Sequence, residues 1–110
     1  MKWDQHRVAE IRFLHEQDGP SERLLKEKLR EMFRKNRAVE RAYLAIAQLG
    51  EETGVVLGLA ARFGPEEKIV TKVQTVFASV FNSSEHLDIL FLTAKQETEL
   101  TQVCKPFFSV

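Results

Sequence analysis

The sequence predicts an α+β fold, in which one mainly antiparallel sheet carries helices on one face. Short apolar segments that suit strands alternate with longer segments whose apolar residues recur every three or four positions. Glycine and proline stand between these segments, where turns are needed. The 110 residues are 44% apolar and 29% charged, which is ordinary for a globular protein. We therefore expect a single domain over residues 1–110 with a complete core.

The first strand and the first helix are predicted between Arg7 and Asn36. Residues 7–15 mix apolar and charged side chains, as a half-buried strand does. Pro20 suits the first helical position, where its missing N–H costs nothing, and Ser21 offers a cap. Asn36 can adopt the left-handed conformation that ends a helix. The helix between them carries one apolar stripe, which consists of Leu25, Leu29, Met32 and Phe33.

The middle of the chain is ambiguous between helix and strand. Alanine and leucine in Val39–Leu49 favour a helix, whereas its aromatic and β-branched residues suit a strand buried on both faces. The loop of residues 50–54 favours a strand for Val39–Leu49, because the loop has the length of a hairpin connection and leads into an apolar run over residues 55–63. Within that run, Gly58 indicates a bulge or the close approach of another backbone.

A second helix, a strand and a short last helix complete the prediction. Pro65 and two glutamates open the second helix, whose apolar positions keep to one face for over three turns: Ile69, Val70, Val73, Val76, Phe77, Val80 and Phe81. His86–Leu92 makes a short apolar strand. Thr93 and Gln96 then form a capping-box pattern ahead of a helix that reaches about Cys104.

The predicted element order is βαββαβ with one helix added, which is the series of a ferredoxin-like sandwich. Such a fold packs its helices on one face of the sheet. The opposite face would still carry apolar residues, so we expect a partner, a tail or a ligand to cover it.

Charge and cysteine content narrow the class of protein. Sixteen basic and sixteen acidic residues cancel, which removes a global electrostatic argument for nucleic acid or an anionic membrane. Cys104 is the only cysteine, and a free thiol without disulfides fits a reducing compartment. The longest uncharged run, Val73–Ser84, is too short to cross a bilayer. We expect a cytoplasmic protein that does not enter the membrane.

The residues that could carry chemistry form no recognisable constellation. His6, His15 and His86 lack the spacing of a metal motif. Ser83 and Ser84 precede His86 without a GxSxG elbow, so a polar turn is the simpler interpretation. The glycines fit no phosphate-binding loop. We therefore predict that the protein is not an enzyme and has no metal site and no cofactor.

Basic residues at the end of the first helix are the first candidate binding feature. Residues 23–41 hold eight basic and three acidic residues, and the candidates among them are Arg34, Lys35, Arg37 and Arg41. They could bind phosphate, RNA or an acidic partner. Pairing along the helix and complementarity to its dipole explain most of these charges, however. No array of aromatic residues accompanies them, which argues against nucleic acid.

Phe107 and Phe108 are the second candidate binding feature, because they place two large aromatic side chains almost at the chain end. The tail either packs on the domain or forms an exposed aromatic hook for a partner. Packing is favoured, since burial of aromatic side chains strongly stabilises a small domain.

The sequence also resembles a known family. Val39–Ala45 reads VERAYLA, and an apolar strand pair, an amphipathic helix, a further strand and a closing KPFF follow it. In these features residues 20–108 resemble the C-terminal domain of the enhanced serine sensitivity protein SseB. The resemblance implies a bacterial protein in which Val39–Leu49 is a strand. The family name reflects a phenotype rather than an assigned reaction, so the resemblance supplies no catalytic residues.

We therefore expect a protein-interaction or regulatory module that binds a protein partner, or forms a homodimer, through the sheet face and the tail. The alternative is a small-molecule sensor that binds amino acids. It rests on an analogy with other βαββαβ modules and on the turn at residues 18–20 between a strand and a helix.

Overall fold

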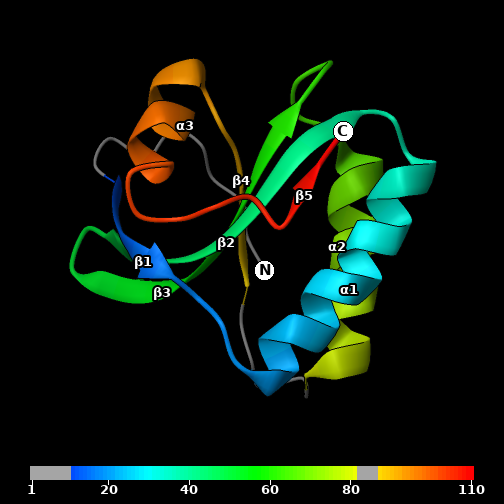
Figure 1. Cartoon of the computed structure of the whole chain (residues 1–110), viewed down its shortest axis with the longest axis horizontal. Coiled ribbons are helices and arrows are strands. Elements are labelled where there is room, and N and C mark those ends of the chain that lie inside the picture. Colours follow the sequence, from blue (N-terminus) through cyan, green and yellow to red (C-terminus); the bar gives the residue numbers. More distant parts are fainter. Residues whose placement is uncertain (1–10, 82–86) are drawn as a thin grey trace.

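The computed structural model describes residues 11–81 and 87–110 (Figure 1). Its elements in chain order are β1 (Ile11–Glu16), α1 (Pro20–Lys35), β2 (Val39–Leu49), β3 (Glu52–Ala61), α2 (Glu67–Val80), β4 (Asp88–Phe91), α3 (Ala94–Leu100) and β5 (Phe108–Ser109). The α+β class and the order of the first seven elements are confirmed, and β5 is an additional strand. Residues 7–10 of the first predicted strand and His86 of the last lie outside the described residues.

The strand order does not confirm the ferredoxin-like sandwich. The sheet runs β1-β2-β3-β4, with β5 also paired to β2. β1, β3 and β5 are antiparallel to β2, whereas β4 is parallel to β3. In a split βαβ unit another strand separates the two strands that the first helix joins. Here the long β2–β3 hairpin forms the centre of the sheet. β1 pairs directly with β2, on the side of β2 that faces away from β3. The order of elements along the chain does not fix which strands become neighbours.

The prediction that the helices lie on one face of the sheet is wrong. α1 and α2 pack side by side on one face, whereas α3 lies on the other (Figure 1). Side chains alternate along β2, so Ala42 and Leu44 join the core beneath α1 and α2. Tyr43 and Ala45 point the other way and pack against α3. α3 of the same chain therefore covers part of the face for which we expected a partner, a tail or a ligand.

Gly58 explains how α3 approaches the sheet so closely. A Cβ atom at this position would lie 3.1 Å from Leu100 and 3.2 Å from Leu92. The β2–β3 register continues unbroken through Gly58, so there is no bulge at this residue. Its close neighbours are the side chains of Leu92 and Leu100, so the prediction that another backbone approaches here is wrong. Thr93 and Gln96 form the predicted capping box, which turns the chain back over the sheet directly after β4.

Four predicted helix ends need correction. α2 begins at Glu67 with Glu66 as its N-cap, so Pro65 lies before the helix and does not open it. α1 begins at Pro20 as predicted, but its N-cap is Gly19, so Ser21 already lies inside the helix. Asn36 has an extended backbone with φ −117°, and its side chain instead accepts a hydrogen bond from the Ala38 N–H at 3.1 Å. α3 ends at Leu100 rather than near Cys104, since turns follow it.

The C-terminal tail packs along β2. The Phe107 N–H donates to the Ala42 carbonyl and the Val110 N–H to the Glu40 carbonyl, both at 2.9 Å. Phe108 is 7% exposed, and its ring centroid lies 5.6 Å from that of Phe33. The tail is therefore packed on the domain, which was the favoured alternative.

Candidate functional site

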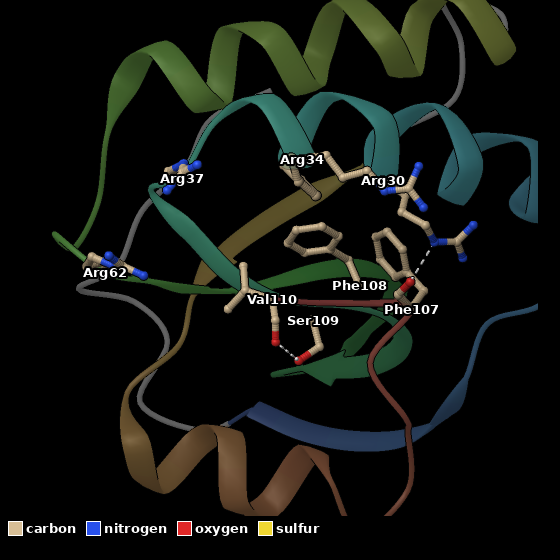
Figure 2. Close-up of a pocket in the computed structure, with 9 residues that line it drawn as sticks. Arg30, Arg34, Arg37, Arg62, Phe107, Phe108, Ser109 and Val110 are labelled. Carbon is tan, nitrogen blue, oxygen red and sulfur yellow. Dashed lines mark hydrogen bonds between the residues drawn. The ribbon is translucent and has the colours of Figure 1, made fainter.

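A cleft of about 520 Å³ lies between α1, the tail and the loop that follows β3 (Figure 2). We call it the arginine cleft. Four arginines, three phenylalanines and the last two residues line it: Arg30, Phe33, Arg34, Arg37, Arg62, Phe107, Phe108, Ser109 and Val110.

α1 supplies one side of the arginine cleft. Arg30 and Arg34 are one helical turn apart and so lie on the same face of α1. Arg37 lies two residues after the end of α1 and lines the same cleft. Leu29 and Phe33, which are buried beside this stripe, hold α1 against the sheet and fix the direction in which the arginines point.

The β2–β3 pairing brings Arg62 to the same cleft. The Arg62 N–H donates to the carbonyl of Ala38 at 2.7 Å, so Arg62 lies beside the residue that follows Arg37. In Figure 2, Arg37 and Arg62 occupy one end of the cleft and Arg30 the other, with the tail between them. Two parts of the chain that are far apart in sequence thus contribute cations to one surface.

Within the described part of the chain, three of the four arginines have a partner. The Arg30 Nε donates to the Phe107 carbonyl at 2.9 Å, which ties α1 to the tail. Arg34 donates to Glu31 at 3.1 Å, and both side chains of this pair are at least 60% exposed. The Arg62 Nε lies 3.6 Å from a carboxylate oxygen of Glu40. Exposed ion pairs of this kind contribute only about 0–1 kcal/mol, so an incoming anion can compete for both arginines.

The floor of the arginine cleft is aromatic. Phe107 is half-buried, and the buried Phe108 packs against Phe33 beneath it. The cleft therefore combines an apolar floor with a rim of guanidinium groups.

The structure brings four of the six predicted site residues together. Arg34, Arg37, Phe107 and Phe108 all line the arginine cleft. Lys35 does not, because it lines a separate depression between α1 and α2.

Arg41 lies outside the cleft as well, because strand alternation turns it towards α3. It forms an ion pair with Glu97, in which the Arg41 Nη2 donates to the Glu97 Oε1 at 3.0 Å. Sequence reasoning missed Arg30 and Arg62. The spacing of Arg30 from Arg34 could have revealed the first, but Arg62 joins the cleft only through strand pairing.

Arg41, Glu97 and Tyr43 form a polar lock that fastens α3 to β2. The Tyr43 hydroxyl donates to the Glu97 carboxylate at 2.6 Å. The Arg41 hydrogen bond keeps the pKa of Glu97 below its usual value, against the opposing effect of burial. Burial, with the adjacent Glu97 carboxylate, raises the pKa of Tyr43 to about 12. All three groups therefore keep one protonation state near neutral pH.

A second charged cluster stabilises the turn between β1 and α1. The buried Lys26 amine lies 3.3 Å from Glu16 and 3.4 Å from Asp18. Asp18 also accepts hydrogen bonds from Arg23, which are the main reason that its pKa lies below the usual value. The Lys105 N–H donates to Glu16 at 3.3 Å, which connects this turn to the tail.

The other described side chains that could bind a metal ion or react as nucleophiles form no common site. Within residues 11–81 and 87–110, no three His, Cys, Asp or Glu side chains are arranged to hold a metal ion. His6, Ser83, Ser84 and His86 lie outside the described residues. Cys104 is buried, and burial raises the pKa of its thiol to about 11, which favours the unreactive thiol form. None of the described helices is long and apolar enough to cross a bilayer.

The fold and the arginine cleft define a small α+β domain with a mixed sheet and a cationic surface cleft. The chain belongs to the SseB protein C-terminal domain family, whose model matches residues 11–109. This match confirms the resemblance that the sequence motifs indicated. Neither the curated proteins nor the solved structures gave a match.

Proposed function

We propose that this domain is a cytoplasmic, non-catalytic module that binds a protein partner through the arginine cleft. The observation that carries this proposal is that four arginines line one surface cleft with an aromatic floor. Arginine and aromatic side chains are enriched in the parts of protein interfaces that contribute most of the binding energy.

The titratable groups support a non-catalytic role. A general acid or base works best when its pKa lies near the operating pH. The pKa of Glu97 is lowered and those of Tyr43 and Cys104 are raised, so each moves away from neutrality. The charges of Lys26 and Asp18 are used within their own cluster.

The two other expected functions have less support from the geometry. Self-association through the sheet face was expected because that face would expose apolar residues. α3 covers Tyr43 and Ala45 on this face, which weakens the argument. An amino-acid sensor at the turn of residues 18–20 would use the Asp18 carboxylate to bind a ligand ammonium group. That carboxylate already accepts hydrogen bonds from Arg23 and Lys26.

Site-specific photo-crosslinking in the native host tests the proposed function. A benzophenone amino acid replaces Ser109, an exposed residue that lines the arginine cleft, or Gln102, an exposed residue beyond α3. We expect a discrete crosslinked protein from position 109 and none from position 102. The product should disappear when Arg34→Glu and Arg37→Glu are combined, because this pair reverses the charge of one side of the cleft.

A matched variant controls for the change in net charge. Lys28→Glu with Lys68→Glu alters the net charge equally at two exposed residues that do not line the cleft. The crosslink from position 109 should persist in it. Absence of any crosslink from position 109, or a crosslink that survives the arginine substitutions, would contradict the proposed function.

A further inference from the structure

We infer that the partner contributes an extended acidic peptide segment that carries a large apolar side chain between its carboxylates. This inference rests on the proposed function and specifies the chemistry of the partner. It depends on how the charges are distributed, on where α1 ends, and on the apolar surface near the cleft.

The positive charges lie at separate ends of the arginine cleft. Arg37 and Arg62 are found at one end, and Arg30 lies at the other with Arg34 one helical turn away (Figure 2). A compact anion is best bound where several guanidinium groups converge on one point. An extended peptide advances about 3.3 Å per residue and can place separate carboxylates at both ends. The spread of charge therefore favours an extended acidic ligand.

The end of α1 makes the cleft less suitable for a compact dianion. α1 ends at Lys35, and the exposed carbonyls at a helix C-terminus carry a partial negative charge. Phosphate groups prefer the opposite end of a helix, where N–H groups are free. Glu31 and Glu40 bring two further carboxylates close to Arg34 and Arg62. Single carboxylates, each paired with one arginine in a bidentate contact, suit this surface better.

Apolar surface lies near the arginines and can accept a hydrophobic side chain. Phe107 is half-buried in the floor of the cleft, and Val110 is 75% exposed at its rim. Phe63 follows Arg62 directly and is 76% exposed. A single-stranded RNA would need several aromatic faces for stacking, and Phe108 is buried. The combination favours a peptide with both acidic and apolar side chains.

Selection from a random library of displayed peptides, with the whole chain as bait, tests this inference. We expect the peptides that bind to carry at least two Asp or Glu residues on either side of an aromatic or large aliphatic residue. Combining Arg37→Glu with Arg62→Glu should weaken the binding of such a peptide at least about tenfold, as loss of charge pairs at an interface does. The affinity for the unaltered chain should also fall as salt is added.

The Lys28→Glu and Lys68→Glu variant is the matched control and should retain the affinity of the unaltered chain. Far-ultraviolet circular dichroism checks that both variants fold. Selection of neutral or basic peptides, or equal binding of acidic peptides by the cleft variant, would overturn the inference. Tighter binding of a uridine oligonucleotide than of the selected peptide would overturn it in favour of RNA.

The two proposals fail in different ways. If position 109 crosslinks to a protein but the crosslinked segment is not acidic, the proposed function stands and this inference fails. If no cleft-dependent crosslink forms, the proposed function itself fails.

Discussion

At the scale of single residues, the polar lock on α3 shows how one carboxylate can hold two elements together. Glu97 accepts hydrogen bonds from Arg41 at both carboxylate oxygens, and its Oε2 also accepts one from the Tyr43 hydroxyl. Its side chain is 17% exposed and that of Arg41 is 39% exposed, so water screens the pair only in part. The lock joins residues more than fifty positions apart in the chain and fixes α3 over the sheet.

Replacing Glu97 tests the lock. We expect Glu97→Gln to lower the free energy of unfolding by about 1–2 kcal/mol, because Arg41 loses its charged partner and Tyr43 a strong acceptor. Urea denaturation measures this loss. The folded pKa of Glu97 is depressed, so its contribution is present above the usual value of 4.5 and is lost as pH falls through the folded pKa. The difference between the variant and the unaltered chain should therefore shrink in acid. If the difference in free energy of unfolding between the variant and the unaltered chain did not depend on pH, this result would contradict an ion pair between Glu97 and Arg41.

Tyr43 offers a direct spectroscopic test, since it is the only tyrosine of the chain. Titration of the tyrosine absorbance should show a midpoint near the raised pKa of about 12 rather than near 10. Because the folded pKa is raised, this group stabilises the fold fully below about pH 10 and loses its contribution as pH rises through the folded pKa. In the Glu97→Gln variant the midpoint should move down, since the negative neighbour is gone. A midpoint near 10 in the unaltered chain would mean that the tyrosine is not buried beside Glu97.

At the scale of elements, the contact between α3 and β3 depends on a missing side chain. The 3.1–3.3 Å distances around the position of a Gly58 Cβ are tighter than ordinary contacts, so Leu92 and Leu100 would have to move to accommodate one. Here a glycine allows α3 to lie close to the sheet.

Gly58→Ala should therefore destabilise the protein by about 1–3 kcal/mol through overpacking. The control is Gly54→Ala in the same strand, where an added Cβ meets no atom within 4 Å. We expect that control to change stability by no more than about 0.5 kcal/mol. Thermal unfolding of both variants measures the difference. Equal effects at the two positions would show that α3 does not pack closely over Gly58.

At the scale of the whole molecule, the tail connects the core to the arginine cleft. Phe108 is buried between α1 and the sheet, while Ser109 and Val110 form part of the cleft surface. The Arg30 hydrogen bond to the Phe107 carbonyl adds a further link between α1 and the tail. The shape of the cleft therefore depends on the packing of a segment at the chain end.

Phe108→Ala should cost about 3–5 kcal/mol of stability, as the loss of a buried aromatic ring does. It should also abolish the crosslink from position 109 under conditions in which the variant remains folded. Val110→Ala, at a side chain that is 75% exposed, should change stability by less than about 0.5 kcal/mol. Equilibrium denaturation and the crosslinking assay check these outcomes. If Phe108→Ala had a small effect on both, the tail would not define the cleft.

Short stretches of sequence were enough to predict the first seven elements, because the information for each lies within a few neighbouring residues. The period of the apolar residues predicted α1 and α2, the hairpin loop decided that residues 39–49 form a strand, and Thr93 and Gln96 predicted the start of α3. The motifs also indicated the SseB C-terminal domain family, which the family model confirms.

Which strands are neighbours, and which arginines line one cleft, became clear from the folded chain alone. Arg41 and Ala42 are adjacent in sequence, yet the alternation of strand side chains sends Arg41 to Glu97 under α3 and Ala42 to the opposite core. Arg37 and Arg62 have no sequence relation, and they line one cleft because β2 and β3 pair. Strand pairing and the choice of sheet face depend on contacts between distant segments, and no short stretch of sequence contains them.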